Sequence, residues 1–317
     1  MNVSLQINVA PSDYPHVQYI LKKQLEILSN QVNEIIVTID SIPSKGRFAT
    51  GWHENKDNLT HYLYTEIVPY FNVKIQFVDY SSVCVKEVSN FFFCDKLIPA
   101  KDFRGGPFYA YFFGIFSAKN NFVFHLDSDI ILGGGSSRWI AEALEKFQSK
   151  PTIFVISPLP GPPHPQQLLV GQSDYQKIED YVFQFKRMST RIFIVDKSRF
   201  QENKLKLTKP SFRNQIKAVV EGNPNADLPE HLISNMMSER GLNRIDFLGS
   251  DEGLWSLHPP FRNREFYQKL PQILSFVNDG NLPHAQFGFY DIVDEICDWS
   301  ENRLQLRKNR WWKRIVR

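Results

Sequence analysis

The chain has 317 residues, enough to bury a sizeable core in one large α/β domain or in one domain with an appended segment. Hydrophobic residues make up 42% and charged residues 22%, which is ordinary for a globular protein, whereas the 26 Phe, 12 Tyr and 6 Trp exceed average usage. The net charge is +3, but residues 301–317 hold seven Lys or Arg against Glu301, so the first 300 residues carry −3. This slightly acidic body excludes the broad basic face of a nucleic-acid-binding domain.

The three cysteines, Cys84, Cys94 and Cys297, are odd in number and lack the spacing of metal ligands. They predict neither a disulfide framework nor a zinc site, and they favour a reducing compartment. The N-terminus lacks the features of a signal peptide, and no apolar run reaches the length of a transmembrane helix. We therefore expect a cytoplasmic protein.

The first part of the chain predicts strands that alternate with helices. The apolar patterns indicate helices at 14–28 and about 59–70, and strands at 3–9, 34–40 and 73–78. The strand at 34–40 is a β-branched run, which suits a buried parallel strand. This order predicts a parallel sheet with right-handed crossovers.

The next unit ends in a pair of acidic residues. An aromatic helix at 109–118 follows Arg104-Gly105-Gly106-Pro107, and a strand at 121–126 stops at Asp127-Ser128-Asp129. Ligands of open α/β sheets bind beyond the carboxyl ends of the strands, so we expect this turn to face a ligand. Paired carboxylates suit Mg²⁺ or Mn²⁺, which share oxygen ligands with substrate phosphates. The alternative is an acidic turn that only caps the next helix.

The remaining chain predicts a less regular second half. A helix is expected at 138–147 and a strand at 152–157, and the five prolines between 158 and 165 predict a loop. A further strand at 190–195, a helix at 228–239 and a short strand at 243–248 follow.

The stretch from Arg104 to Asp129 resembles glycosyltransferase family 2, in which a glycine-containing loop, a helix and a strand lead to the Asp-x-Asp turn of the GT-A fold. The beginning of the chain is also similar, with a short strand, Pro11, a helix and a strand that ends in Asp40. The resemblance implies an α/β, Rossmann-type, mainly parallel sheet flanked by helices. The residues that it implies for binding a nucleotide-sugar donor are Pro11, Asp40, Arg104, Asp127, Ser128 and Asp129. Taken alone, Asp40 is more simply a residue of the turn after a strand.

The second half resembles the family at a helix that starts with Pro229-Glu230 and ends before Gly241, and at the later pair Leu257-His258. The resemblance implies that Glu230 is the general base, although Pro229 replaces the acid expected before it, and that His258 joins Asp127 and Asp129 as a metal ligand. Without the resemblance, Glu230 simply favours the positive N-terminus of its helix, and His258 is a packed or exposed histidine.

Three residues before His258 are candidates for acceptor recognition only. They are Asp251, Glu252 and Trp255. Aromatic faces stack on sugar rings, but they also fill cores.

The resemblance implies a metal-dependent, inverting transferase that uses Mn²⁺ or Mg²⁺. It would move a sugar from a nucleoside-diphosphate sugar to a hydroxyl of a carbohydrate, lipid-linked or small-molecule acceptor. Two alternatives remain open. A sugar nucleotidyltransferase usually has a glycine-rich, basic N-terminal loop, which residues 8–13 lack, and a catalytically inactive binding or scaffold protein could keep the same fold.

The predicted organisation is a GT-A-like domain at 1–260, with a nucleotide-binding half at 1–130 and an acceptor-binding half at 131–260, and a C-terminal extension at 261–317. The tail at 303–317 combines basic residues with Trp311 and Trp312. This mixture predicts a peripheral contact with an anionic membrane surface, at the cytoplasmic face. Packing of the two indoles on the domain or on a subunit is an equally good interpretation.

Overall fold

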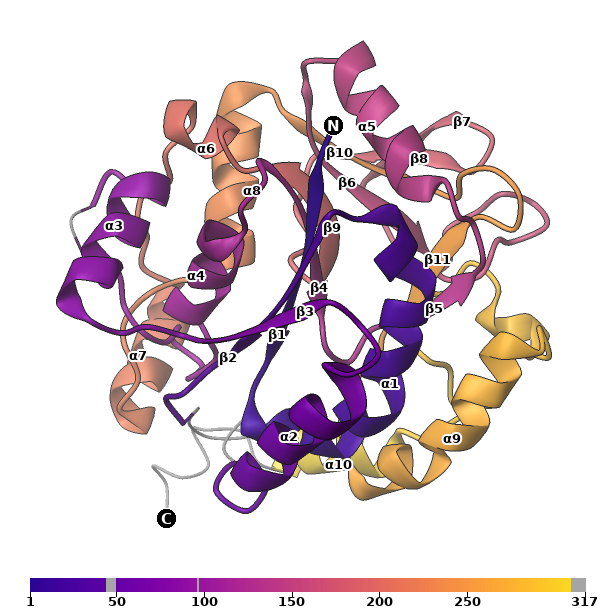
Figure 1. The fold of residues 1–317 in the computed structure, drawn as a ribbon, viewed down its shortest axis with the longest axis horizontal. Helices are drawn as coiled ribbons and strands as arrows, with labels where there is room; N and C mark the ends of the chain where they lie inside the picture. Colours follow the sequence, from indigo (N-terminus) through magenta and orange to yellow (C-terminus); the bar gives the residue numbers. More distant parts are fainter. Residues whose placement is uncertain (44–49, 96, 309–317) are drawn as a thin grey trace.

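A computed structural model describes residues 1–43, 50–95 and 97–308. A large central sheet is covered by helices on both faces (Figure 1). Its strand order is β3-β2-β1-β4-β9-β6-β10-β8-β7, and β5 and β11 form an attached ladder beside β6. The predicted α/β class, with a sheet flanked by helices, is confirmed.

The first half of the sheet is parallel, as the alternating pattern predicts. β1 pairs with β2 on one side and with β4 on the other, and β3 pairs with β2. Because β1 lies between β2 and β4, the strand order reverses there, which is where an open α/β sheet forms a crevice. The strands are β1 (Val3–Val9), β2 (Glu34–Ile39), β3 (Val73–Phe77) and β4 (Phe122–Asp127).

The predicted helices of this half are also present, and one more helix was not predicted. Helix α2 continues directly into a π-helical turn at Leu63–Ile67, and the two together span 56–67. They correspond to the helix expected at about 59–70, but begin and end three residues earlier. The additional helix is α3 (Ser82–Phe92). The others are α1 (Tyr14–Leu28), α2 (Lys56–Tyr62) and α4 (Tyr109–Ser117).

The second half of the sheet is mixed. β9 (Ile192–Asp196) runs antiparallel to both β4 and β6, and β6 (Ile153–Pro160) runs parallel to β10 (Asn243–Phe247). An antiparallel hairpin of β7 (Tyr175–Glu179) and β8 (Val182–Phe185) closes this edge. The parallel arrangement expected for most of the sheet therefore holds for its first half, and antiparallel pairs are frequent in the second.

The loop predicted from residue 158 is wrong at its beginning, because β6 continues to Pro160. All eight residues of β6 are buried, and β9 pairs with β6 only at Val155 and Ile156. Beyond those residues that side of β6 has no β9 partner, so a proline there interrupts no ladder hydrogen bond with β9.

The other elements of the second half surround this strand. Helices α5 and α8 match their predictions, whereas β5, β11 and the helices after residue 260 were not predicted. Their bounds are β5 (Ile131–Gly134), α5 (Trp139–Ser149), α6 (Arg199–Glu202), α7 (Phe212–Glu221), α8 (Pro229–Arg240), β11 (Leu254–Leu257), α9 (Arg264–Asn278) and α10 (Ser300–Lys308).

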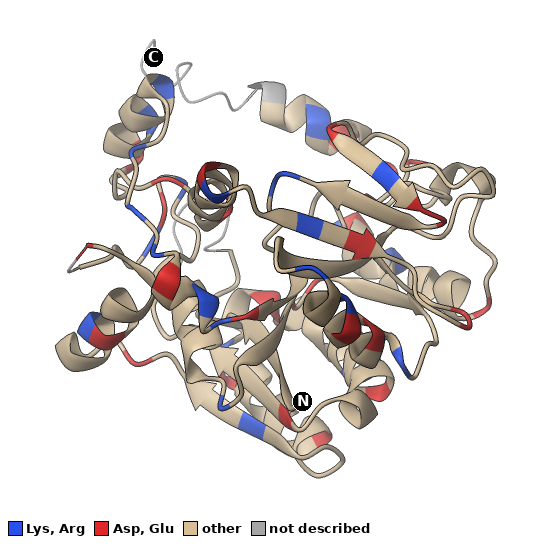
Figure 2. Ribbon diagram, turned by 90° about the horizontal axis from the view of Figure 1, so that it is seen from above, with Lys and Arg blue, Asp and Glu red and all other residues tan. Residues whose placement is uncertain are grey.

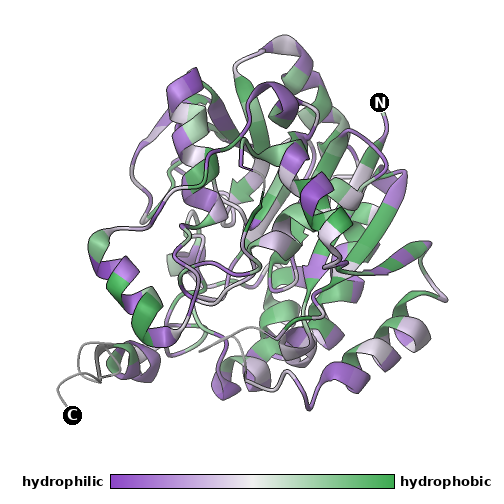
Figure 3. Cartoon of the chain, turned by 90° about the vertical axis from the view of Figure 1, so that its left-hand side faces the viewer, coloured by the Kyte–Doolittle hydropathy of each residue, from purple (hydrophilic) through white to green (hydrophobic). Residues whose placement is uncertain are grey.

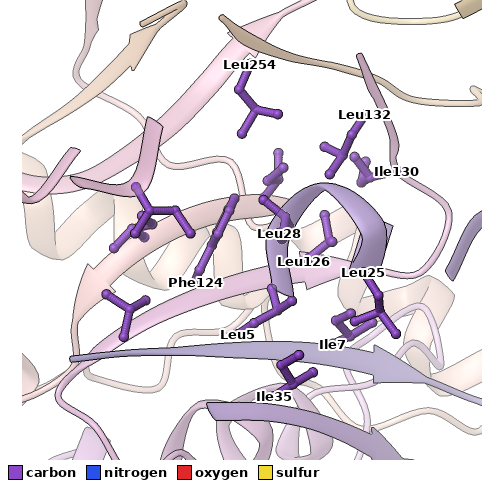
Figure 4. Packing of buried hydrophobic residues seen from close by; sticks show 14 of the residues in the cluster. Leu5, Ile7, Leu25, Leu28, Ile35, Phe124, Leu126, Ile130, Leu132 and Leu254 are labelled. Atoms are coloured by element: carbon purple, nitrogen blue, oxygen red, sulfur yellow. The ribbon is translucent and has the colours of Figure 1, made fainter. Parts of the chain in front are cut away.

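Two apolar layers hold the helices on the sheet. On one face, Leu25 and Leu28 of α1 pack over Leu5 of β1 and Leu126 of β4 (Figure 4). On the other face, α3, α4 and α8 bury an aromatic cluster that includes Phe112. Figure 3 shows the strands as mostly hydrophobic and the helices as alternately hydrophobic and hydrophilic. This is the pattern of a sheet that is buried on both faces.

The segment after residue 260 packs on the body of the protein. Phe266 and Leu270 of α9 share a third cluster with Ile20 of α1 and Leu159 of β6. Residues on both sides of the expected boundary at 260 thus contribute to one core, and the division into domains stays a prediction. The last residues of the predicted tail, 309–317, lie outside the described residues.

Candidate active site at the carboxyl ends of the strands

A cavity of about 660 Å³ lies beyond the carboxyl ends of β1, β2 and β4. Its wall brings together residues from both halves of the sheet and from α10. Seven predicted site residues line it, namely Asp40, Arg104, Asp127, Ser128, Asp129, Glu230 and His258. The carboxyl-end position expected for the acidic turn therefore agrees with the structure.

Four other predicted residues do not line the cavity. Pro11 is buried in a short 3₁₀ turn, although its neighbours Ala10 and Ser12 do line it. Asp251 and Glu252 are exposed in the turn before β11. Trp255 is 7% exposed, and its ring lies directly over Gly133 of β5, where a Cβ atom would collide with it. Trp255 is thus a core side chain, and the acceptor role of these three residues stays a prediction.

The acidic turn is held in place by backbone contacts. The backbone N–H of Asp127 donates to the carbonyl oxygen of Arg191 over 2.8 Å. From α1, the Gln24 side chain donates to the carbonyl oxygens of Asp127, over 3.3 Å, and Ile130, over 2.7 Å. The turn is therefore fixed both by the sheet and by the helix that covers it.

Ser128 belongs to a buried polar network with the first loop. Its hydroxyl group donates to Asp13 over 3.4 Å and lies 3.1 Å from Nε2 of His16. Burial lowers the pKa of His16 to about 4, against an opposing effect of the Asp13 carboxylate. The His16 imidazole is therefore neutral near pH 7 and adds no charge beside the acidic pair.

Arg262 is a site residue that sequence reasoning missed. Its guanidinium group lies 2.9 Å from Oδ1 of Asp13 and 3.7 Å from Oδ2 of Asp129, and its side chain is 30% exposed. Arg262 thus joins the first loop, the acidic turn and the segment after residue 260. No local signal could have found it, because 249 residues separate it from Asp13.

Asp129 lies in a cationic environment. Burial opposes ionisation of its carboxyl group, but nearby positive charge, above all that of Arg262 and also that of Arg191, outweighs burial and lowers the pKa of Asp129. Arg191 also lines the cavity. The Asp129 carboxylate is therefore ionised near pH 7, and positive charge is available beside it for an anionic ligand.

His258 is oriented by a carboxylate. Its Nδ1 lies 2.8 Å from Oδ1 of Asp291, and its ring stacks on Tyr290 with centroids 5.7 Å apart. Because Asp291 engages Nδ1, Nε2 is the ring nitrogen that can meet a ligand. A carboxylate behind a histidine is the usual support of an imidazole that binds a metal ion.

Glu230 and Tyr111 lie on the same part of the wall. Burial raises the pKa of Tyr111 well above its usual value, and the negative charges of Asp127 and Glu230 raise it further. Its buried hydroxyl group has no hydrogen-bond partner within the described part of the chain. Tyr111 therefore stays protonated, which leaves a hydrogen-bond donor close to both carboxylates.

Asp40 and Arg104 are each tied to neighbouring loops. Asp40 accepts hydrogen bonds of 2.7 Å from the hydroxyl of Tyr80 and the ammonium of Lys101. Asp102 accepts from the backbone N–H groups of Arg104, over 2.7 Å, and Gly106, over 3.0 Å. Asp40 lines the cavity, but its carboxylate also holds this wall together.

The cavity wall contains side chains that could bind a divalent cation. Within residues 1–43, 50–95 and 97–308, no three or more His, Cys, Asp or Glu side chains form a metal cluster. A cation that is completed by substrate phosphates needs only one or two carboxylates from the protein, and Asp127, Asp129 and the oriented His258 supply ligands of the right chemistry. By their chemistry these residues would suit a metal ion that takes its remaining ligands from a bound diphosphate.

Lys and Arg are interspersed with Asp and Glu over most of the chain (Figure 2). Among the described helices, none combines the length and the apolar composition needed to cross a membrane.

Comparisons with known proteins find distant structural similarity only. No protein-family model matches the sequence, and no curated protein is significantly similar to it. Solved structures that resemble it include TarS of S. aureus (14% identity, 90% of this chain and 41% of that chain, TM-score 0.39). A second is the mannosyltransferase PcManGT from Pyrobaculum calidifontis, with 10% identity, 89% of this chain and 65% of that chain covered, and a TM-score of 0.40. A third is a UDP-glucose pyrophosphorylase, with 10% identity, 87% of this chain and 98% of that chain covered, and a TM-score of 0.46. The chain thus spans about two fifths of the TarS chain, and similarity at this level identifies no family.

Proposed function

We propose that the protein is a glycosyltransferase that moves a sugar from a nucleoside-diphosphate sugar to an acceptor hydroxyl, with inversion at the anomeric carbon. The observation that carries the proposal is the meeting of three kinds of group in one cavity. These are the acidic turn at Asp127–Asp129, the Glu230 carboxylate, and the cationic side chains of Arg191 and Arg262. A diphosphate between the cations, with its sugar directed toward a carboxylate, would use all of them.

The donor would lie along the carboxyl ends of β1 and β2. A cavity of about 660 Å³ has the size of a small-molecule site. Asn8 and Thr38 line it, and the hydroxyl of Thr38 donates to the side chain of Asn8 over 2.5 Å. Arg191 and Arg262 would face the phosphates, because guanidinium groups form strong charge-assisted hydrogen bonds with phosphate oxygens.

A Mn²⁺ or Mg²⁺ ion would be shared between the donor diphosphate and ligands drawn from Asp127, Asp129 and His258, which form no three-ligand cluster among the described residues. When bound, it would neutralise the charge on the departing nucleoside diphosphate. The protein prepares this side of the cavity by keeping Asp129 ionised and by turning Nε2 of His258 away from Asp291.

Glu230 would act as the general base. Its carboxylate takes the proton of the acceptor hydroxyl while the acceptor oxygen forms a bond to the anomeric carbon. The bond between that carbon and the phosphate oxygen breaks, and the nucleoside diphosphate leaves. Tyr111 would donate a hydrogen bond nearby, since its hydroxyl stays protonated. The acceptor is a carbohydrate, a lipid-linked sugar or a small molecule.

The proposal is tested with Glu230→Gln, which keeps the shape of the side chain but cannot take up a proton. The donors to assay first are UDP-GlcNAc and GDP-Man, which are named for TarS and PcManGT. With Mn²⁺ present, we expect transfer and donor hydrolysis to fall about 100-fold or more, as for loss of a general base. Binding of the nucleoside diphosphate, followed by thermal shift, should persist. The matched control is Glu239→Gln, an exposed glutamate at the other end of α8.

The same assays separate the alternatives. A nucleotidyltransferase would consume the nucleotide sugar only when pyrophosphate is added and would release a nucleoside triphosphate. A scaffold protein would bind nucleotides without turning over any donor. Either result, or full turnover by Glu230→Gln, would contradict the proposal.

A further inference from the structure

Helix α7 exposes an apolar face that no described residue covers. Its exposed apolar side chains are Phe212 (77%), Ile216 (37%), Val219 (75%) and Val220 (46%). These positions follow the spacing i, i+4, i+7 and i+8, so they share one face of the helix. Scattered exposed apolar residues are normal, but a continuous helical face indicates a binding surface.

The opposite side of α7 fixes the helix to the body. Ala218 is fully buried in a cluster with Phe103 and Leu228. The ammonium of Lys217 lies over the ring of Phe103, 5.9 Å from its centroid, and 3.8 Å from the carboxylate of Glu221. The apolar face is therefore presented outward by a helix that is packed on its other side.

Basic residues precede and interrupt this face in the sequence. The stretch from residue 203 to residue 220 contains five Lys or Arg and no Asp or Glu. Lys206, Lys209 and Arg213 are exposed, and the last two flank Phe212 in the sequence. A short helix with an apolar face and basic flanks is complementary to an anionic lipid surface, because apolar side chains enter the headgroup region while cations meet the headgroups.

The position of α7 places this face near the cavity. Phe103 and Leu228, which pack on Ala218, precede the cavity residues Arg104 and Pro229 in the sequence. α7 lies at the lower end of the molecule, to which the carboxyl ends of β1 and β2 also point (Figure 1). A surface that covers α7 would therefore lie close to the part of the cavity wall that contains Arg104 and Pro229.

We infer that α7 docks the protein on an anionic membrane surface, with Phe212 and Val219 in the lipid interface and Lys206, Lys209 and Arg213 at the headgroups. This docking is independent of the proposed transferase activity. It is also distinct from the predicted membrane contact of the 303–317 tail.

The test is sedimentation of the full-length protein with vesicles of phosphatidylcholine alone and of phosphatidylcholine mixed with phosphatidylglycerol. We expect binding to the anionic vesicles only, and weaker binding at high salt. The double variants Phe212→Ser/Val219→Ser and Lys206→Glu/Lys209→Glu should each reduce the partition coefficient by roughly tenfold or more. Both act at exposed positions, so the fold should persist, and the charge variant keeps the test valid if the apolar variant unfolds.

Matched controls lie on α3, which exposes Val83 and Lys86. Val83→Ser and Lys86→Glu should leave vesicle binding unchanged. The inference is overturned if the unchanged protein does not bind anionic vesicles, or if the α7 variants bind as well as it does. It is also overturned if the protein is a dimer that Phe212→Ser/Val219→Ser dissociates without any effect on vesicles, because a second copy would then cover the face.

Discussion

The two halves of the sheet contribute to the candidate site in different ways. In the first half, parallel strands end at the cavity with acidic residues at their ends, since Asp40 directly follows β2 and Asp127 is the last residue of β4. In the second half, Arg191, Glu230 and His258 come from separate segments that meet only in the folded chain. One wall of the site is thus set by strand ends, and the other by tertiary packing.

The two walls also differ in charge around Asp129. The carboxylates of Asp13 and Asp129 belong to the first half, whereas Arg191, Arg262 and His258 lie beyond it. The negative charge of one wall partly neutralises the positive charge of the other, so that several ionised groups can remain partly buried in the site. Neither wall is a complete binding site alone, and single substitutions can separate their contributions.

The largest effect on activity is expected from Asp129→Asn, which removes one negative charge from the first wall. Because this carboxylate is held ionised by the opposite wall, we expect sugar transfer to fall about a thousandfold. Steady-state kinetics with saturating Mn²⁺ measures the loss. The control is Asp57→Asn at an exposed position of α2, and circular dichroism checks the fold. Transfer at the rate of the unchanged protein would remove Asp129 from the mechanism.

The next effect concerns acid stability and the buried contact of His16 with Ser128. Burial lowers the pKa of His16 from 6.5 to about 4, so between these pH values the unfolded chain binds more protons than the folded protein. The free energy of unfolding therefore decreases as pH falls through this window, by roughly 3 kcal/mol from this residue. The variant His16→Gln should not show this decrease in the free energy of unfolding.

Urea unfolding between pH 4 and 7 measures the difference. Asp246 contributes in the opposite direction, since burial raises its pKa to about 6, and the two variants His16→Gln and Asp246→Asn should change the slope with opposite signs. His61→Gln, at an exposed position of α2, is the control. An unchanged slope in His16→Gln would show that the histidine is not held neutral.

A smaller effect is expected for the second wall through Arg262→Gln. Loss of its charge removes the ion pair with Asp13 and the positive charge proposed for the phosphates. A charge-assisted hydrogen bond contributes about 1.5–3 kcal/mol, so UDP should bind roughly ten- to a hundredfold more weakly. Calorimetry without metal isolates this contribution. Arg264→Gln, exposed at the start of α9, should bind UDP normally, and equal affinity in Arg262→Gln would separate Arg262 from the ligand.

The smallest effect is expected outside both walls. Asp251 and Glu252 lie in an exposed turn away from the cavity wall. The double variant Asp251→Asn/Glu252→Gln should therefore change kcat/KM by less than about twofold, as is common for surface positions. A large rise in KM for the acceptor would instead support the acceptor role that the sequence suggested and would extend the second wall to this turn.

Much of the first half was predictable because its signals are local. The apolar run before Asp127 predicts a buried strand, and an acidic turn that follows such a strand lies at the carboxyl edge of a parallel sheet. The second half was less predictable. β6 includes prolines that normally end a strand, and β7, β8 and β11 are short strands whose pairing depends on distant partners.

By itself, the sequence determined the strands of the first 130 residues and most of the helices between them, with α3 as the exception. It also placed Asp127 and Asp129 at the carboxyl end of a strand, because hydrophobic periodicity and strand ends depend on neighbouring residues. Only the tertiary structure decided that Arg262 meets Asp13 and Asp129, and that Trp255 is buried. Contacts between residues more than a hundred positions apart depend on how whole elements pack, and no local pattern encodes them.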